Sequence, residues 1–328
     1  MPALGVIGYG LVGKQRVAEA LAVGIPPQDI FVTDPMKQKS DFDGRINNVT
    51  VDEFSNMDFV NVIVATPHDV ATNWALHFLS SGARVLLEKP MGRNLAEAQQ
   101  LARHNLAKNL SLGFNYRHMA GVRELRGLLT EGTLGELSRV KIELGHGGSP
   151  KDRDSWKLDP DKCGGGALLD PGIHVIDLLL HLNNACANDL ILSGGSTWKG
   201  FWKTGIEENV TLVGKLGKVP FVLDVSVVAW RTRFKVEILG TEGYAELSGR
   251  GRSDGPQELI SGKRWGWLEG KSQQDSEDKL LTSPTDESFR IETAAWLNGQ
   301  PEVCDSKSGL ETMKAYDAMV HQLGEVTK

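Results

Sequence analysis

The sequence predicts two successive units of different class. Residues 1–117 are expected to form an α/β unit with a doubly wound parallel sheet, and residues 118–328 an α+β unit with a large, mainly antiparallel open sheet. Short apolar runs alternate with helical patterns as far as about Asn115, which is typical of a parallel sheet with crossover helices. Beyond Gly132 the apolar residues recur at every second position instead, which is typical of strands with one buried face. A length of 328 residues also favours two domains.

The composition is that of an ordinary globular chain, with 40% hydrophobic and 24% charged residues. The net charge of -6 and the lack of a dense Lys/Arg block argue against a nucleic-acid or membrane partner, so a small molecule is expected. Three widely spaced cysteines indicate neither a disulfide framework nor a zinc site, so no metal is expected. With no basic leader and no apolar run of roughly 18–20 residues, a cytoplasmic location is expected.

The first apolar run, over residues 3–7, leads into a glycine-rich loop and then a helical pattern. In a strand, GxGxxG, helix arrangement the glycines allow a tight turn, close approach of the backbone to a pyrophosphate, and close packing of helix on strand. The helix N-terminus then faces the phosphates. We therefore predict a dinucleotide site. The loop residues expected to contact the cofactor are Gly8, Tyr9, Gly10, Leu11, Val12 and Gly13.

An acidic residue, Asp34, follows the second predicted strand at about 20 residues from the glycines, where a carboxylate accepts hydrogen bonds from an adenosine ribose. Because a carboxylate repels a 2′-phosphate, NAD is predicted over NADP. Lys37 and Lys39 lie close by in the sequence and keep NADP open as an alternative.

Two further strands, over residues 59–65 and 84–87, end in polar residues. The carboxyl ends of parallel strands face the ligand crevice of such a sheet. Further cofactor contacts are therefore predicted at Thr66, Pro67, His68, Glu88 and Lys89. From its position alone, Lys89 is equally well a surface lysine before a turn-forming proline.

The second unit shows a different pattern. Apolar residues alternate over residues 140–144, 210–212, 221–227 and 234–238, and residues 240–243 predict a hairpin turn. Residues 248–284 are rich in glycine, serine and charge and predict no element. Helical patterns over 287–297 and 309–323 close the chain, and these helices are candidates for packing back on the first unit.

The stretch over residues 164–181 combines three glycines, a strongly apolar run and three polar side chains. A helix from about Pro171 places Asp170, His174 and Asp177 on one face, since side chains three or four apart are neighbours. Buried groups of this kind are costly unless they are paired, and a carboxylate raises the pKa of a paired histidine into the range useful for proton transfer. The alternative is a structural histidine flanked by two capping carboxylates.

Together these motifs resemble the glucose-fructose oxidoreductase / inositol dehydrogenase (Gfo/Idh/MocA) family over nearly the whole length. The matching stretches are GYGLVG at 8–13, ATP at 65–67, LLEKP at 86–90, GFNYR at 113–117, GTLGEL at 132–137, GGGALLDPGIHVID at 164–177 and LGTEG at 239–243. The resemblance implies a Rossmann domain, NAD(P) as cofactor, and Lys89, Asp170 and His174 as catalytic residues. One departure is that members often carry a histidine near the position of Ala71, whereas this chain has His68.

The expected activity is hydride transfer between NAD and a secondary alcohol or carbonyl of a sugar, cyclitol or sugar derivative. Lys89, Asp170 and His174 are also expected to bind the substrate, together with Arg117 and Trp156. For Arg117 an ion pair, and for each tryptophan ordinary packing, are the alternatives. Other functions left open are a catalytically silent NAD- or sugar-sensing regulator of the same fold and a reductase of a non-sugar carbonyl, imine or tetrapyrrole. The half-exposed sheet predicts a homodimer or homotetramer.

Overall fold

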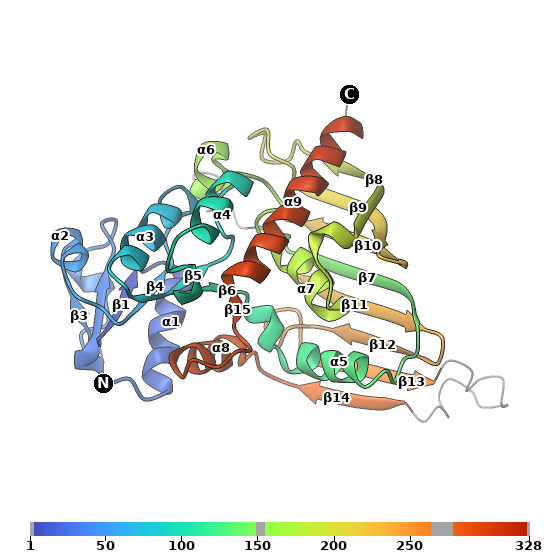
Figure 1. The fold of residues 1–328 in the computed structure, drawn as a ribbon, viewed down its shortest axis with the longest axis horizontal. Helices are drawn as coiled ribbons and strands as arrows, with labels where there is room; N and C mark the ends of the chain where they lie inside the picture. Colours follow the sequence, from blue (N-terminus) through green and yellow to red (C-terminus); the bar gives the residue numbers. More distant parts are fainter. Residues whose placement is uncertain (1–2, 149–154, 264–277, 327–328) are drawn as a thin grey trace. The chain divides into compact units, whose positions relative to one another are not determined.

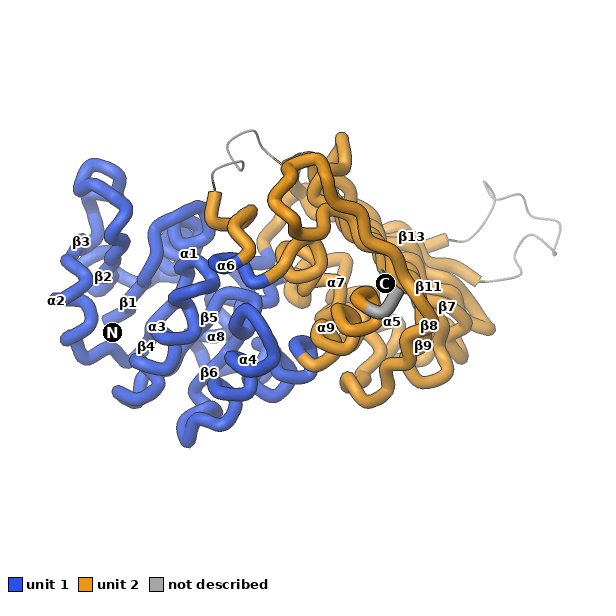
Figure 2. The backbone as a smooth tube through the Cα atoms, turned by 90° about the horizontal axis from the view of Figure 1, so that it is seen from above, with its two compact units in different colours: residues 1–115, 161–164, 288–313 blue, residues 116–160, 165–287, 314–328 orange. Residues whose placement is uncertain are grey.

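The computed structural model describes residues 3–148, 155–263 and 278–326. The chain divides into two compact units (Figure 2). Unit 1 comprises Met1–Asn115, Asp161–Gly164 and Ser288–Met313, and unit 2 comprises Tyr116–Pro160, Gly165–Glu287 and Lys314–Lys328. A four-residue segment of the later chain, directly before Gly165, therefore belongs to unit 1.

Unit 1 is built on a seven-stranded sheet in the order β15-β6-β5-β4-β1-β2-β3 (Figure 1). All neighbouring strands are parallel except β15, which pairs antiparallel with β6. Its strands are β1 (Leu4–Ile7), β2 (Ile30–Thr33), β3 (Asn47–Asn48), β4 (Asn61–Val64), β5 (Arg84–Glu88), β6 (Leu110–Gly113) and β15 (Cys304–Asp305), and its helices include α1 (Leu11–Ala22), α2 (Val51–Ser55), α3 (His68–Ser80), α4 (Leu95–Ala102) and α8 (Ser288–Leu297). The strand order reverses between β1 and β4, which is where a doubly wound sheet binds its ligand.

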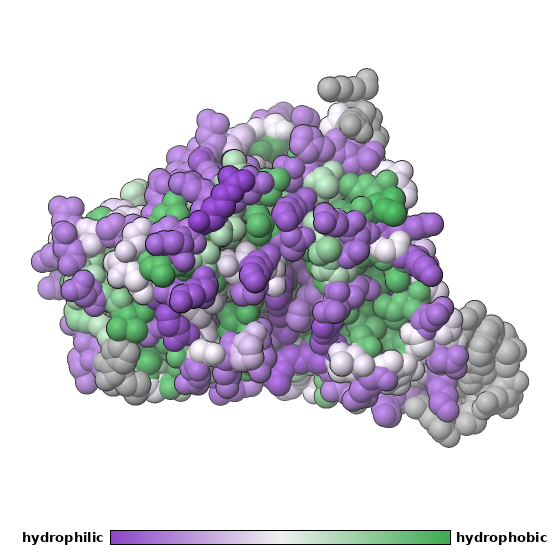
Figure 3. Space-filling view, viewed as in Figure 1, coloured by the Kyte–Doolittle hydropathy of each residue, from purple (hydrophilic) through white to green (hydrophobic). Residues whose placement is uncertain are grey.

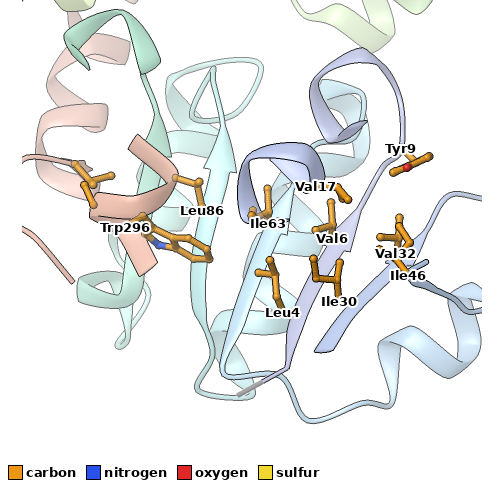
Figure 4. Close-up of a cluster of buried hydrophobic side chains, with 13 residues drawn as sticks. Leu4, Val6, Tyr9, Val17, Ile30, Val32, Ile46, Ile63, Leu86 and Trp296 are labelled. Carbon is orange, nitrogen blue, oxygen red and sulfur yellow. The ribbon is translucent and has the colours of Figure 1, made fainter. Parts of the chain in front are cut away.

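The core of unit 1 explains why its strands read as continuous apolar runs. Every residue of β1 and β4 is buried, because helices cover both faces of a parallel sheet. On one face Leu4, Val6 and Ile63 pack with Trp296, which α8 contributes from the far end of the sequence (Figure 4). Although α8 comes near the end of the chain, it belongs to unit 1 and contacts α1.

Unit 2 is built on an eight-stranded sheet in the order β14-β13-β12-β11-β7-β10-β9-β8. Its neighbours are antiparallel except for the β7–β10 pair. The strands are β7 (Leu137–Gly145), β8 (Leu190–Trp198), β9 (Asn209–Leu216), β10 (Val219–Ser226), β11 (Arg233–Gly240), β12 (Gly243–Ser248), β13 (Gln257–Lys263) and β14 (Lys279–Ser283). The predicted fold class, a doubly wound parallel sheet followed by a mainly antiparallel one, is confirmed.

One face of this second sheet is covered by α5 (Ala120–Thr130) and α7 (Ile173–Asn183) (Figure 1). Side chains at every second position are buried on that face, as the alternating pattern predicted. The other face carries cross-strand ion pairs such as Arg139–Glu237 and Lys235–Glu246. Its exposed aliphatic side chains lie on strands toward the two edges: Ile191, Val213, Ile260 and Leu280.

Two strands lie in the stretch for which the sequence predicted no element. β13 and β14 occupy Gln257–Lys263 and Lys279–Ser283 and pair with one another. β8 was also not predicted, since Gly194 and Gly195 interrupt its alternation at a register shift. The chain's last helix, α9 (Ser306–Val326), contains the boundary between the units at Met313.

The visible surface carries hydrophilic residues with interspersed apolar patches (Figure 3). Among the residues that the structure describes, no helix is long and apolar enough to cross a membrane. Within the same residues, no group of three or more His, Cys, Asp or Glu side chains is arranged to hold a metal ion.

Candidate active site

The glycine-rich loop lies at the switch point of unit 1, between the ends of β1 and β4. Gly8 has a φ of +92°, and a Cβ there would lie 2.4 Å from the carbonyl oxygen of Ala65. A Cβ on Gly13 would lie 1.9 Å from the carbonyl oxygen of Gly8, so this glycine allows α1 to pack against the loop. A Cβ on Gly10 would meet nothing within 4 Å. Gly8 thus allows the turn, Gly13 allows close packing of the helix, and Gly10 leaves the backbone open to a ligand, as a dinucleotide-binding loop requires.

The N-terminus of α1 is open for an anion. Its N-cap is Gly10, which has no side chain to satisfy the first amides, and its first turn holds no acidic residue. The apolar side chain of Leu11 is 89% exposed at this point. Unpaired amides and the positive end of the helix dipole favour a pyrophosphate at such a position.

Asp34 lies at the end of β2 beside this loop. Its carboxylate accepts hydrogen bonds from the backbone nitrogens of Tyr9 (2.7 Å) and Met36 (2.9 Å). Each carboxylate oxygen has a further lone pair, so these bonds orient the group and leave it able to accept from a ribose hydroxyl. The Tyr9 ring is buried and stacks on Phe42, with ring centroids 4.8 Å apart.

The end of β4 presents the predicted Thr66-Pro67-His68 segment. The hydroxyl oxygen of Thr66 is buried without a hydrogen-bond partner, which fits a position where a bound group completes the bonding. The Nδ1 atom of His68 lies 2.8 Å from the carbonyl oxygen of Cys163, and the imidazole is buried. His68 therefore holds the inserted Asp161–Gly164 segment, a role that the sequence did not suggest.

Two of the predicted site residues, Glu88 and Lys89, lie at the end of β5. The carboxylate of Glu88 lies 2.6 Å from Nε of the fully buried Arg16, whose guanidinium also contacts Glu292 at 2.5 Å. This ion pair gives Glu88 a structural role beside the predicted cofactor role. Lys89 follows at the same edge of the sheet, partly buried. The peptide bonds that join Lys89 and Asp170 to their following prolines are both cis.

In unit 2 the segment from Gly165 to Asp170 forms a tight turn before α7. The backbone nitrogen of Asp170 donates to the carbonyl oxygen of Gly166 at 2.9 Å, and α7 begins only at Ile173. A Cβ on Gly166 would lie 2.2 Å from the carbonyl oxygen of Glu207. The group that lies close to Gly166 is therefore the backbone of Glu207 and not a bound ligand.

The three polar residues of this stretch have three different neighbours. The Asp170 carboxylate, 15% exposed, lies 3.3 Å from the Lys157 ammonium. The His174 imidazole stacks on the ring of Tyr116. The sequence predicted Asp170, His174 and Asp177 on one helix face, but Asp170 precedes α7, so only His174 and Asp177 lie on this helix.

The third of these residues, Asp177, is paired with Arg117. The guanidinium donates to both carboxylate oxygens, at 2.8 and 2.6 Å, and both side chains are almost fully buried. Because the fork of Arg117 is engaged inside the protein, the ion-pair alternative for this residue is favoured over the predicted substrate contact.

A cavity of about 120 Å³ lies next to Asp170, entirely within unit 2. Its polar wall is formed by Asp170, Lys157 and His146, and its apolar wall includes Trp202 and Ile206. Trp156 and His174, both expected to bind the substrate, are absent from this lining. The sequence offered no signal for Trp202, because nothing local connects it with a turn 32 positions earlier. Trp230, which is 91% exposed, lines a different hollow.

A Rossmann sheet with an open glycine loop at its switch point defines unit 1 as a dinucleotide-binding domain. Residues 3–116 match the family model described as "Oxidoreductase family, NAD-binding Rossmann fold", and residues 122–246 match that of the "GFO/IDH/MocA C-terminal domain". The chain belongs to the GFO/IDH/MocA family of oxidoreductases, and NAD is the cofactor class that its first domain binds.

Individual relatives agree with this assignment, and a solved structure has the same fold. The glucose-6-phosphate 3-dehydrogenase of Bacillus subtilis (strain 168) is 29% identical over 191 residues, which cover 56% of this chain and 54% of that protein. The 1,5-anhydro-D-fructose reductase of Ensifer adhaerens is 29% identical over 192 residues, covering 56% and 55%. The aligned stretch thus spans about half the length of these relatives. A levoglucosan dehydrogenase solved in complex with NADH superposes with a TM-score of 0.81 at 18% identity, covering 99% of this chain and 97% of that one.

Proposed function

We propose that this protein is an NAD-dependent oxidoreductase that transfers a hydride between the nicotinamide and a secondary alcohol or carbonyl of a sugar, cyclitol or sugar derivative. The observation that carries the proposal is the cavity beside Asp170, whose wall combines the Lys157–Asp170 pair with His146 and Trp202. Polar groups that fix hydroxyls next to an aromatic wall suit a polyhydroxylated ring. The two relatives described above, a glucose-6-phosphate 3-dehydrogenase and a 1,5-anhydro-D-fructose reductase, support the same substrate class.

NAD, when bound, supplies the hydride acceptor for alcohol oxidation. The open backbone of the loop over residues 8–13 would hold the pyrophosphate, and the Asp34 carboxylate would hold a ribose. The buried hydroxyl of Thr66 would make a further polar contact.

The proposed catalytic roles fall to three side chains. His174 takes the proton of the substrate hydroxyl as the carbonyl forms, Asp170 orients and balances the charge of the imidazolium, and Lys89 stabilises the negative charge that develops on the same oxygen. In the reverse direction His174 returns the proton. The Lys157 ammonium, 3.3 Å from the Asp170 carboxylate, supplies a positive charge beside it.

The test is NADH formation by the purified protein with a panel of sugars, sugar acids, sugar phosphates and cyclitols. Turnover of at least one member, lost in the His174→Ala variant, is the expected result. If no member is oxidised and NADH reduces none of the matching ketones, the proposal fails, and a silent sensor becomes the better reading. Tight binding of NADH in the same preparation separates that outcome from an inactive sample.

We also propose that the protein forms a homo-oligomer through the uncovered face of the unit 2 sheet. Ile191 and Leu280 on that face are 57% and 63% exposed, and the cross-strand ion pairs between them offer alternating charge. A sedimentation mass near 35.8 kDa at micromolar concentration would count against this assembly.

A further inference from the structure

We propose that Glu207 and Glu208, two adjacent carboxylates directly before β9, are positioning residues that hold two separate segments of the wall around the Asp170 cavity. This inference rests on the proposed function, because it assigns that cavity to the substrate. Neither residue belongs to a motif that the sequence singled out. All the contacts that carry the inference lie within unit 2.

Glu207 holds the turn that carries Asp170. Its Oε1 atom accepts hydrogen bonds from the backbone nitrogens of Gly166 (3.1 Å) and Leu168 (3.3 Å), and its backbone carbonyl accepts from Ala167 at 2.8 Å. Three consecutive amides are thus bound by one residue. The carbonyl oxygen of Gly166 in turn accepts a hydrogen bond from the backbone nitrogen of Asp170. Asp170, the proposed catalytic carboxylate, is therefore linked to Glu207 through Gly166.

Glycine at position 166 is a consequence of this arrangement. A Cβ there would lie 2.2 Å from the carbonyl oxygen of Glu207 and 2.6 Å from its carboxyl carbon. Backbone atoms cannot give way by that amount, so a side chain at 166 would push the turn off Glu207. The close approach places the Asp170 turn by direct contact as well as by hydrogen bonds.

Glu208 holds the segment that carries Trp202. Its side chain is completely buried and accepts from three consecutive amides: Gly200 (2.9 Å) and Phe201 (2.8 Å) at Oε2, and Trp202 (2.6 Å) at Oε1. Trp202 then forms part of the cavity wall together with Ile206. The adjacent residues Glu207 and Glu208 thus position both the polar and the apolar wall of the Asp170 cavity.

The chemistry of the two carboxylates differs in a way that makes the inference testable. The hydrogen bonds of the Glu207 side chain use only Oε1, so a glutamine at 207 can keep them with its amide oxygen. The Glu208 carboxylate accepts hydrogen bonds through both oxygens. In a glutamine at 208 the side-chain NH₂ group would face at least one backbone N–H, and two donors cannot form a hydrogen bond. Burial raises the pKa of Glu207, against the lowering effect of the backbone amides, which agrees with a side chain that functions as an acceptor without needing full charge.

The experiment compares Glu207→Ala, Glu207→Gln and Glu208→Gln with wild type on a substrate found in the panel, with Asp189→Ala as control. Asp189 is a carboxylate of unit 2 that also accepts a hydrogen bond from a backbone nitrogen, that of Cys186 at 2.9 Å, and it lies outside the Asp170 cavity. We expect Glu207→Ala to lower kcat by about 10- to 100-fold, since small misplacements of catalytic groups have effects of this size. Glu207→Gln should restore kcat to within roughly threefold of wild type, and Glu208→Gln should raise the substrate KM about tenfold, the equivalent of one lost contact.

Hydrogen exchange supplies a readout that does not depend on turnover. The amides of residues 166–168 should exchange faster in Glu207→Ala but not in Glu207→Gln, and those of residues 200–202 should exchange faster in Glu208→Gln. If Glu207→Ala does not fold, Glu207→Asp serves in its place, since it withdraws the carboxylate but keeps the charge.

Unchanged kcat, KM and exchange in Glu207→Ala would overturn the inference, as would equal impairment of the alanine and glutamine variants. A wild-type protein that turns over no member of the panel is the failure of the proposed function instead. The exchange pattern still decides the positioning role in that case.

Discussion

The ring of Tyr116 lies parallel to the imidazole of His174, with ring centroids 4.0 Å apart and an interplanar angle of 7°. The phenol oxygen accepts a hydrogen bond from Nη1 of Arg250 at 2.5 Å, which holds the ring from its other end. Burial raises the pKa of Tyr116, so the neutral phenol is the form that packs here. The stack fixes the plane of the proposed base, because an imidazole on a flat aromatic face cannot tilt freely.

Replacement of Tyr116 tests this role. Tyr116→Leu should lower kcat by about 2- to 12-fold, because an aromatic pair contributes about 0.5–1.5 kcal/mol beyond its buried area. Tyr116→Phe keeps the stack, and Arg250 keeps its Asp254 partner, so this control should retain most of the turnover. Steady-state kinetics of both variants, with NAD affinity as a check on folding, would decide. A larger loss in Tyr116→Phe than in Tyr116→Leu contradicts the argument.

Asp34 should determine the cofactor preference. Its carboxylate is fixed by the Tyr9 and Met36 amides at the end of β2, where it opposes a 2′-phosphate. Wild type should therefore bind NADH more tightly than NADPH, and Asp34→Ser should narrow the difference without unfolding the protein. Paired fluorescence titrations measure both affinities, and Asp52→Ser, on the exposed surface of α2, is the matched control. Tighter NADPH binding by the wild type would show the prediction to be wrong.

The parts of the site that the sequence predicted depend on short-range rules. The glycine loop and Asp34 were predictable because a strand, a turn and a helix N-terminus are set by neighbouring residues, and parallel strands end at one edge. The helix that carries His174 and Asp177 was predictable from its apolar run, whereas the place of Asp170 before the helix and the partners of these residues were not. Arg117 lies 60 positions from Asp177 and the Glu207 carboxylate 41 positions from Gly166.

The choice among tryptophans shows the same limit. Trp156 stands near the glycines in the sequence, and Trp202 stands far from them, but Trp202 lines the cavity. Proximity in a chain says little about neighbours once two loops are brought together by long-range pairing, as β8 and β9 bring Trp198 opposite Asn209. Glu88 likewise had a predicted cofactor role from its place at a strand end, while its strongest contact is with Arg16, 72 positions away.

Removal of Arg16 should strongly destabilise unit 1. The guanidinium is fully buried and lies 2.6 Å from Glu88 and 2.5 Å from Glu292, so Arg16→Ala leaves two carboxylates without their cation. The expected loss is about 3–5 kcal/mol in the free energy of unfolding. Arg45→Ala removes an exposed pair with Asp43 and should leave the free energy of unfolding nearly unchanged. Urea denaturation measures both, and similar losses in the two variants would refute the prediction.

His181 should make the protein less stable in acid. Burial, and then the nearby Arg117 guanidinium, lower its pKa from 6.5 to about 4. Between these two pH values the unfolded chain binds more protons than the folded one, so stability falls as the pH drops from about 6.5 and the effect is complete below about 4. Since a shift of one pKa unit corresponds to about 1.4 kcal/mol, the loss in the free energy of unfolding approaches roughly 3 kcal/mol. In His181→Asn this part of the pH dependence should vanish, as thermal unfolding at a series of pH values will show. An identical slope in the variant would mean that other groups cause it.

The catalytic roles make a prediction about pairs of substitutions. Lys89→Ala and His174→Ala should each leave NAD affinity nearly intact, since neither residue supplies the pyrophosphate or ribose contacts. Turnover should fall by about 10²- to 10⁴-fold for the loss of a general base, and by about 10²- to 10³-fold for the loss of a group that stabilises the oxygen. Binding titrations and single-turnover kinetics separate these effects.

The double variant is the sharper measurement, because both side chains are proposed to act on one substrate oxygen. Its turnover should be much less impaired than the product of the two single effects, since residues that act as a unit are not additive. The wild-type oxidation rate should also decline as the pH falls and the base becomes protonated, and His174→Ala should lack that limb of the profile. A His174→Ala enzyme with wild-type turnover and the same pH dependence would instead show that the imidazole on Tyr116 is structural.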